Sequence, residues 1–508
     1  MTDIIKNDVR EKEKITAVKP LFSHLPERLF GLEELAENLW WSWNLGARML
    51  FKTLDREAAP ISRVLDKDGR QRIVKVPLTD PPIHVAVGKV AVGRVSLYLM
   101  DTDVAINDPW NRGITARLYI GDFEQRLRQE IVLGLGGAAV LNDLGIHPEK
   151  PEAGFNMTAF ALKLSGCRNA VSKRHAEVSR KMWRSLWPAV PEDRVPIDHV
   201  TNGVHVPTWI EPKIKLLLDT YLGADWLDKH DDPAIWQRLD NVPDSELWQT
   251  HHWLKVKLID AIRERTRLRW ADGGGSSSVM LAGGAFLDPS VLTLGFARRF
   301  ATYKRALLIF QDLDRLKKHF KDRWRPIQII FAGKAHPADD PGKRLLQDLI
   351  NLARNPQLGG RIAFVEDYGE QLAQYLVHGV DVWLNNPLPP FEACGTSGMK
   401  AALNGVPHLS VVDGWWGEGF NGKNGWAVDH HANSETPDGS DAEKIYRLLE
   451  DQIIPLYYQM SENGIPLEWV RLMKETIKSA AAAFSARRMV KQYIEKFYSN
   501  SIKNVLDD

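Results

Sequence analysis

The chain has 508 residues, of which 44% are hydrophobic and 26% charged, a composition typical of a globular protein of two or three domains. Its 66 basic and 65 acidic side chains leave a net charge of +1, which excludes a global field favouring nucleic acid or an anionic membrane. It has two distant cysteines, no apolar signal-peptide region and no membrane-length apolar run. We therefore expect a cytoplasmic protein without a disulfide framework.

The first half of the chain predicts helices around a few short strands. Leu32, Leu35 and Leu39 fall on one helical stripe. In chain order we predict a helix over 30–54, strands within 72–100, helices over 114–145 and 156–186, and a loop at 200–209.

Two glycine-rich runs predict different structures. The run GLGG at 134–137 lacks a complete dinucleotide fingerprint, so we interpret it as helix packing rather than a phosphate loop. The run GGGSSS at 273–278 predicts a flexible surface loop.

From about residue 289 the pattern alternates between apolar β-rich runs and helical stretches. Strands are predicted at 291–297, 327–333, 361–366, 380–385 and 409–412, with helices near 304–318, 343–354, 370–378 and 399–404. This alternation predicts a parallel sheet covered by helices, whose ligands bind at the carboxyl edge of the strands. The end of the chain, 468–498, is again predicted to be helical.

The edge rule directs attention to RRFATYKR at 298–305, which follows the first of these strands. Arg298, Arg299, Lys304 and Arg305 stand there without an acidic residue. Cationic side chains at the ligand edge indicate an anion site, and the alternative is a solvated basic turn.

The loop 387–405 follows another strand of the sheet. Its prolines prevent a helix until the small residues Gly395, Thr396, Ser397 and Gly398, and Lys400 lies in the first helical turn. Such a turn wraps a phosphate with backbone amides, and the spacing differs from a nucleotide triphosphate loop. Three interpretations remain open: a phosphate partner, a Schiff-base lysine, or a capping loop with a surface lysine.

No metal site is predicted. The histidine pairs His251–His252 and His430–His431 lack further residues at ligand spacing, so we expect them on the surface.

Taken together, these segments resemble the α-glucan (glycogen or maltodextrin) phosphorylase family, in particular its bacterial and archaeal branch. The resemblance runs from about residue 26 to the end and is nearly continuous over 200–500. It rests on LAENLWWSWN, TARLYIGD, RQEIVLGLGG, FNMTAFALKLS, VTNGVHVPTWI, GFARRFATYKRA, FAGKAHPADDPGK, VDVWLNNPLPPFEACGTSGMKAALNG and VVDGWWGEGFNGKNGWAV, in the family's order.

The resemblance implies roles for individual residues. Lys400 would hold pyridoxal 5′-phosphate through a Schiff base, and Lys304 and Arg299 would be catalytic residues around the substrate phosphate. The other implied cofactor-binding residues are Arg298, Thr396, Gly398, Tyr368 and Trp209, and the implied substrate-binding residues are Asn202, Glu392 and Gly395.

The implied fold is α/β of the GT-B type, with two Rossmann-like lobes and a C-terminal helix that crosses back to the first lobe. The corresponding domains are an N-terminal helical segment (1–60), a shortened first lobe (61–209), a cofactor-binding lobe (210–467) and C-terminal helices (468–508).

The implied reaction moves the terminal glucosyl unit of an α-1,4-glucan to inorganic phosphate, giving glucose 1-phosphate with retention. The cofactor's 5′-phosphate exchanges a proton near neutral pH. The partners would be glucan and phosphate, and a homo-oligomer is compatible with the sequence. A nucleotide-sugar glucosyltransferase on the same fold is an alternative that RRFATYKR and GTSGMK fit poorly.

The chain departs from the family pattern in several places. Cys394 replaces a usual Ser, which weakens one hydrogen bond, and Gly369 replaces a polar residue. Long segments of the first lobe, including a Gly-Gly-Leu-Gly loop and a substrate-facing histidine, are not found before KDGRQRIVKVP or between GIHPEK and FNMT. A second hypothesis is therefore a catalytically impaired relative that binds glucan or cofactor without turnover.

Overall fold

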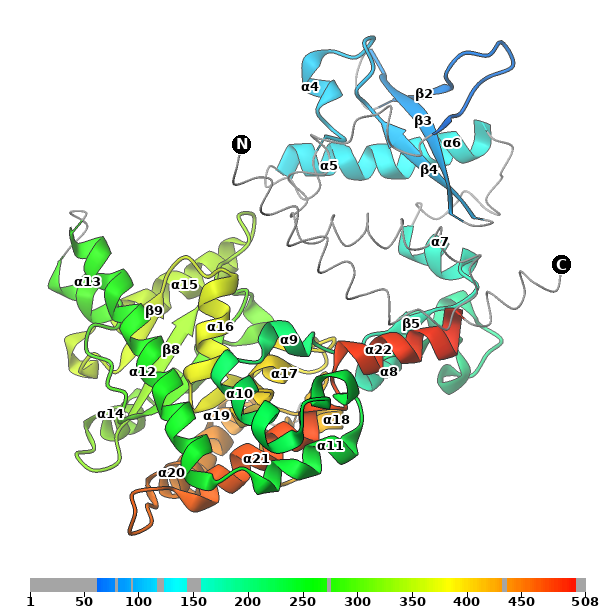
Figure 1. The fold of residues 1–508 in the computed structure, drawn as a ribbon. Coiled ribbons are helices and arrows are strands. Elements are labelled where there is room, and N and C mark those ends of the chain that lie inside the picture. The colour runs from blue at the N-terminus through cyan, green and yellow to red at the C-terminus, as the bar shows by residue number, and fades with distance from the viewer. Residues whose placement is uncertain are drawn as a thin grey trace, which may run out of the picture. The chain divides into compact units, whose positions relative to one another are not determined.

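The chain forms two compact units, 1–157 and 158–508, which are described separately (Figure 1). The computed structural model describes residues 62–77, 81–92, 95–116, 123–143, 157–271, 276–431 and 436–498. The helix predicted over 30–54 lies outside these residues. The predicted domain boundary at 209–210 falls inside the second unit.

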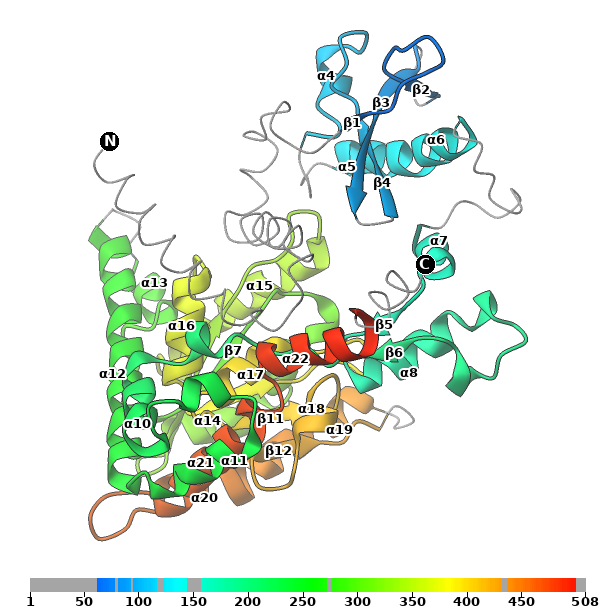
Figure 2. The ribbon, with the colours of Figure 1, turned by 45° about the vertical axis from the view of Figure 1, so that its right-hand side comes forward.

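A small antiparallel sheet with helices packed against it makes up the described part of the first unit (Figure 2). Its elements are β1 (Ser62–Arg63), β2 (Ile73–Val76), β3 (Ile83–Val92), β4 (Val95–Asp101), α4 (Pro109–Arg112), α5 (Phe123–Ile131), a π-helical stretch (Val132–Gly136) and α6 (Gly137–Asp143). Along β2, Val74 and Val76 are buried while Ile73 and Lys75 are exposed, the alternation expected when one face of a sheet packs on a core.

A Rossmann-like sheet, which was predicted for the first lobe, is not found in the described residues of this unit. Strand β3 pairs antiparallel with β1, β2 and β4. Only residues 77–82 separate β2 from β3, and 93–94 separate β3 from β4. Parallel neighbours need a crossover of a dozen or more residues, so these short connections dictate hairpins.

The helix-packing interpretation of the GLGG run is confirmed at Gly136. A Cβ atom there would lie 3.1 Å from Cγ2 of Val76 on β2. The glycine therefore allows the helical segment to approach the sheet closely.

The second unit is built on a six-stranded, fully parallel sheet with helices on both faces (Figure 1). Its strands are β7 (Leu292–Ala297), β8 (Ile327–Ala332), β9 (Ile362–Val365), β10 (Val382–Asn385), β11 (His408–Val411) and β12 (Gly425–Val428). Every residue of β7 to β11 is buried, as expected for strands covered on both faces. The predicted parallel α/β sheet is thus confirmed.

The strand order is β12-β11-β10-β7-β8-β9, so the chain turns from one half of the sheet to the other between β7 and β10. The residues that follow these two strands leave the sheet side by side, at the point where open parallel sheets bind ligands. These are the residues 298–305 and 386–395, which overlap the predicted ligand-edge segments 298–305 and 387–405.

The described residues from 157 onward form the following helices. They are α7 (Met157–Leu164), α8 (Lys173–Met182), α9 (Val206–Trp209), α10 (Pro212–Leu222), α11 (Pro233–Gln237), α12 (Asp244–Arg269), α13 (Ser277–Ala282), α14 (Leu313–Lys321), α15 (Asp340–Ala353), α16 (Glu370–Gly379), α17 (Thr396–Ala402), α18 (Trp416–Gly419), α19 (Pro437–Leu448), α20 (Ile454–Tyr458), α21 (Leu467–Ala481) and α22 (Ala486–Tyr493). The end of the GGGSSS run belongs to α13, so the predicted loop is shorter there.

The C-terminal helix α22 returns to an earlier part of the chain, next to the two short parallel strands β5 (Asn169–Ala170) and β6 (Asp198–His199). Asn169 donates a hydrogen bond to the hydroxyl of Tyr493 at 2.8 Å, and Lys496 forms an ion pair with Asp198 at 3.1 Å. The helix α22 and the π-helical turn that follows it, Ile494–Tyr498, therefore contact both of these short strands.

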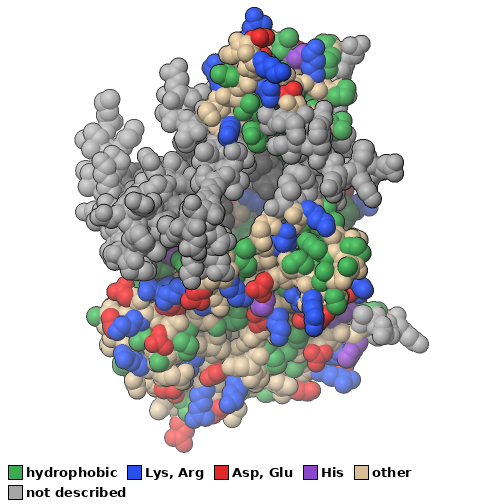
Figure 3. Space-filling view, turned by 90° about the vertical axis from the view of Figure 1, so that its right-hand side faces the viewer, with side chains coloured by type: hydrophobic (Ala, Val, Ile, Leu, Met, Phe, Trp, Pro, Cys, Tyr) green, Lys and Arg blue, Asp and Glu red, His purple; other side chains and the backbone are tan. Residues whose placement is uncertain are grey.

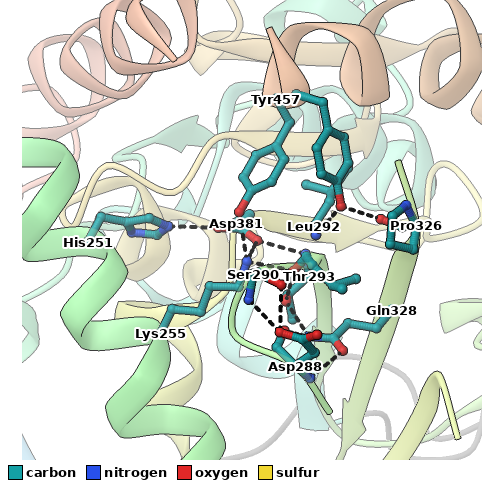
Figure 4. Close-up of polar contacts among 12 residues, drawn as sticks. His251, Lys255, Asp288, Ser290, Leu292, Thr293, Pro326, Gln328, Asp381 and Tyr457 are labelled. Atoms are coloured by element: carbon teal, nitrogen blue, oxygen red, sulfur yellow. Dashed lines mark hydrogen bonds and ion pairs between the residues drawn. The ribbon is translucent and has the colours of Figure 1, made fainter. Parts of the chain in front are cut away.

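A buried polar cluster joins α12 to the amino edge of the sheet, opposite the candidate site (Figure 4). Asp381, immediately before β10, accepts hydrogen bonds from the backbone N–H of Thr293 at 2.7 Å and from His251 Nε2 at 2.9 Å. Lys255 forms an ion pair with Asp381 and donates to the hydroxyl of Tyr457 at 2.8 Å. Burial alone would raise the pKa of Asp381, but Lys255 and His251 hold it below its usual value.

The surface prediction was therefore wrong for His251, which is 1% exposed. His251 shares one face of α12 with Leu247, Leu254 and Leu258, all of them buried, and this helical spacing turns it toward the core. His252 and His431 are exposed, and His430 is half-buried beside Asp441.

No described helix is both long and apolar enough to cross a membrane. On the face in Figure 3, basic and acidic side chains are interspersed over the surface of the coloured residues. This mixture agrees with the net charge of +1.

Replacing Asp381 by Asn should destabilise the second unit, because Lys255 would then keep a buried charge without its carboxylate. Breaking a buried ion pair costs about 3–5 kcal/mol, and urea unfolding at neutral pH should show a loss of this size. The control Asp314→Asn removes an ion pair whose carboxylate is 88% exposed, and should change the free energy of unfolding by less than about 1 kcal/mol. Superimposable unfolding curves for wild type and Asp381→Asn would contradict the prediction.

Candidate active site

A single buried carboxylate connects the two segments that leave the sheet after β7 and β10. Lys304 Nζ forms an ion pair with Oε2 of Glu392, and Arg298 Nη1 lies 3.5 Å from the same oxygen. The three residues are each at most 8% exposed. Two cations and one carboxylate thus leave a net positive charge in a largely desolvated place, an arrangement that attracts a further anion.

Aromatic side chains complete the surroundings of Arg298. Burial lowers the pKa of its guanidinium, while Glu392 and the hydroxyls of Tyr303 and Tyr368 oppose this shift. Burial raises the pKa of Tyr368, against the influence of Arg298. Of the implied residues, Arg298, Lys304, Glu392 and Tyr368 are therefore brought together.

The other two cations of the predicted anion cluster have different environments. Arg299 is exposed and makes no hydrogen bond or ion pair with a described residue. Arg305 points to the loop after β10, where it donates to the carbonyls of Asn386 at 3.0 Å and Pro387 at 2.8 Å and pairs with Asp441 at 2.8 Å. The predicted cluster is thus divided, and Arg305 fixes the loop rather than facing a ligand.

The helix predicted over 304–318 begins later for a related reason. Arg305 adopts a left-handed backbone conformation, with φ of 49°, which no helix interior tolerates. Two short 3₁₀ turns, Thr302–Lys304 and Leu308–Phe310, take its place, and α14 starts at Leu313.

Backbone contacts hold the loop that carries Glu392. The Glu392 N–H donates to Oδ2 of Asp413 at 3.0 Å, and the Trp415 N–H donates to the Cys394 carbonyl at 2.8 Å. Gly395 has φ of 83°, which a side chain would strain, and a Cβ there would lie 3.2 Å from Oε1 of Glu392. Gly395 therefore lies beside the carboxylate of Glu392.

Lys400 projects from α17, which starts directly after this loop. Its Nζ lies 3.6 Å from the centroid of the Trp209 ring and makes no hydrogen bond or ion pair with a described residue. Burial lowers the pKa of Lys400, with only Glu370 opposing. A half-buried amine with a lowered pKa spends more time neutral, which is the nucleophilic form.

The backbone of Trp209 is fixed on the same side. Its carbonyl accepts hydrogen bonds from Asn404 Nδ2 at 2.8 Å and from His378 Nε2 at 3.0 Å. Burial lowers the pKa of His378 to about 4, so the ring is neutral and donates through Nε2–H. The Trp209 ring therefore has a defined position over Lys400.

The structure gives Gly398 a packing role. A Cβ at this position would lie 2.2 Å from Cε1 of His408, which is buried under α17 between Trp415 and Trp416. Burial lowers the pKa of His408 to about 3, so it is neutral. Thr396, which begins α17, is half-buried.

The loop that carries Asn202 is attached to the C-terminal segment. The N–H of Val204 donates to the carbonyl of Phe484 at 2.8 Å, and Arg488 Nη2 donates to the carbonyl of Asn202 at 3.1 Å. The carboxylate of Glu418 accepts from Thr201 at 2.8 Å. Arg488, Glu418 and Asp413 were not foreseen as supports of the site, because their partners are distant in sequence.

None of the described residues forms a group of three or more His, Cys, Asp or Glu side chains suited to a metal ion. Fold and site together define a class: an α/β protein with a buried cluster of two cations and one carboxylate at the switch point of a parallel sheet, and a lysine without a partner among the described residues on the helix that follows. Comparison with known proteins identifies the family. A model described as carbohydrate phosphorylase matches residues 118–416, and the chain belongs to this enzyme family.

Three relatives show the extent of the similarity. Glycogen phosphorylase of Aquifex aeolicus is 44% identical over 532 aligned positions, which cover 88% of this chain and 76% of the relative. Maltodextrin phosphorylase of Thermococcus litoralis is 38% identical and glycogen phosphorylase of Mycobacterium tuberculosis 34%. They match 90% and 88% of this chain, which spans 64% and 63% of their own lengths. A second model, of a protein of unknown function, matches residues 25–62.

Replacing Gly398 by Ala should push α17 away from β11, because the new methyl group would overlap the His408 ring. Overpacking of this kind costs about 1–3 kcal/mol, measurable by chemical unfolding. Adding His408→Ala in the same chain should recover part of the loss by making room. The control Gly417→Ala should be nearly neutral, since a Cβ there meets nothing closer than 3.9 Å. A double variant no more stable than Gly398→Ala would count against the packing role.

The two cysteines should differ in reactivity. Burial raises the pKa of Cys394 to about 12, whereas Cys167 is exposed. Since the thiolate is the reactive form, an aromatic disulfide reagent at about pH 8 should modify one thiol quickly and the second only after unfolding. Cys167→Ser should abolish the fast reaction, and two fast equivalents in the native protein would refute the burial of Cys394.

Proposed function

We propose that this protein is an α-1,4-glucan phosphorylase. It transfers the terminal glucosyl unit of glycogen or maltodextrin to inorganic phosphate, giving glucose 1-phosphate with retention, and it uses pyridoxal 5′-phosphate bound to Lys400. One observation carries the proposal: a half-buried lysine amine without a hydrogen-bond or ion-pair partner among the described residues projects from α17, directly after the loop whose Glu392 pairs with two buried cations. The relatives named glycogen and maltodextrin phosphorylase support the same substrate class.

The residues present fit the cofactor. The Lys400 amine has no competing acceptor among the described residues and a lowered pKa, as a Schiff-base lysine requires. The Trp209 ring offers a flat surface beside the Lys400 amine, and Tyr368 lies close enough to Arg298 to influence its pKa. When bound, the cofactor supplies an aldehyde for Lys400 and a phosphate that exchanges protons near neutral pH.

In this proposal the cationic side chains neutralise phosphate. Arg298 and Lys304 both interact with the carboxylate of Glu392. An incoming phosphate competes for these two cations, which leaves the Glu392 carboxylate available to the glucosyl hydroxyls. Arg299, exposed at the same turn, supplies a third cation to the substrate phosphate. Asn202 and Gly395 lie on the two loops that would enclose the sugar.

We also propose the GT-B arrangement with a shortened first lobe. The alignment with the Aquifex aeolicus relative spans 532 positions, more than the 508 residues of this chain, so that relative carries residues inside the matched span that this chain lacks. This observation favours the second candidate as well, a relative that retains the cofactor and glucan but turns over slowly or not at all.

Borohydride reduction of protein loaded with pyridoxal phosphate tests the cofactor assignment. Peptide mapping should find the modification on Lys400 and lose it in Lys400→Ala, while Lys423→Ala, which removes an exposed lysine, should behave as wild type. Release of glucose 1-phosphate from maltoheptaose then separates the two candidates. Cofactor on Lys400 without release supports the impaired relative, and no modification of Lys400 refutes the proposed chemistry.

A further inference from the structure

An exposed aromatic side chain stands directly beside the buried carboxylate of the site. Phe391 precedes Glu392 in the chain and is 61% exposed, whereas Glu392 is 7% exposed. Its position is fixed by backbone hydrogen bonds: the Phe391 N–H donates to the Leu388 carbonyl at 3.0 Å, and the next N–H is held by Asp413. Hydrogen bonds of the loop backbone thus hold a large apolar ring that is mostly exposed to solvent.

A second aromatic ring adjoins it from the other segment of the site. Tyr303, the residue before Lys304, has its ring centroid 6.3 Å from that of Phe391, with the planes inclined by 55°. The Leu388 N–H donates to the Tyr303 carbonyl at 2.7 Å, which ties the two segments together. Lys304 Nζ lies 4.6 Å from the centroid of the Tyr303 ring. The two rings therefore form an aromatic corner at the side of the Glu392 cluster.

Other exposed aromatic residues of the described chain lie elsewhere. Trp324 is 78% exposed but comes just before β8, at the opposite edge of the sheet. Phe420 is 37% exposed and packs on Trp416 at 5.3 Å. Among the described exposed aromatic residues, Phe391 alone belongs to the segments that carry Glu392 and Lys304.

We propose that Phe391, supported by Tyr303, forms a stacking surface for the glucose unit next to the one being transferred. The proposal rests on the proposed function. A pyranose has hydroxyls around its rim and C–H groups on its faces, so an aromatic face gains contact with it without desolvating a hydroxyl. The Tyr303 ring links Phe391 to the carboxylate, because its centroid lies 6.3 Å from that of Phe391 and 4.6 Å from Nζ of Lys304, which pairs with Glu392. In this arrangement Glu392 binds the terminal glucose unit, and Phe391 contacts the next unit of the glucan chain.

Binding of maltoheptaose to cofactor-loaded protein, measured by calorimetry, tests this assignment. Phe391→Ala should weaken binding by roughly five- to tenfold, the range expected for loss of one aromatic contact, and Phe391→Trp should restore it. Binding of glucose, which has no second unit, should not change. The control Trp324→Ala removes a more exposed aromatic residue and should bind as wild type.

The outcomes distinguish this inference from the proposed function. If the wild type binds maltoheptaose and Phe391→Ala binds it equally well, the stacking surface is overturned and the proposed function stands. If the wild type binds no maltoheptaose although Lys400 carries the cofactor, both the glucan substrate and the stacking surface are overturned. Equal loss of glucose and maltoheptaose binding in Phe391→Ala also overturns it, since it would indicate a general disturbance of the loop.

Discussion

The parallel pairing of β7 with β10 is the constraint on which the site depends. These strands are far apart in the sequence, yet Val382 lies opposite Leu294 and Trp383 opposite Gly295. Only glycine fits at 295, because a Cβ would lie 2.8 Å from Val380. At the amino edge Asp381 is bonded to the first residues of β7, so the carboxyl ends of both strands emerge together and Glu392 reaches its two cations.

Within the site, the buried and half-buried cations differ in their partners among the described residues. Arg298 and Lys304 both interact with Glu392, and Arg305 donates hydrogen bonds to the loop after β10. Lys400 has no hydrogen-bond or ion-pair partner in the described part of the chain, and its Nζ lies over the Trp209 ring. A desolvated amine without a counter-ion is unfavourable when charged, so this position tolerates a lysine best if its amine is neutral or chemically combined. The proposed cofactor supplies such a combination.

Long-range backbone contacts decide how the second wall of the site is held. The loop with Asn202 is bonded to Phe484 and to Arg488 on the last helices, and Glu418 holds Thr201. The end of the chain is therefore part of the site's support, although none of its residues was expected to touch a ligand. Such contacts join positions more than two hundred residues apart, and no local sequence pattern predicts them.

The sequence alone determined the alternating strands and helices of 289–412, their parallel sheet and the two ligand-edge segments, because hydrophobic periodicity and glycine placement are local properties. The resemblance, carried by long motifs, identified the family. Only the tertiary structure decided that Arg305 faces a loop, since no neighbouring residue predicts its left-handed backbone conformation. The burial of His251 was likewise decided by the tertiary structure, because its hydrogen-bond partner Asp381 is distant in the sequence. It also decided that the described sheet of the first unit is antiparallel, because the connections between its strands are too short for the crossovers that a parallel sheet needs.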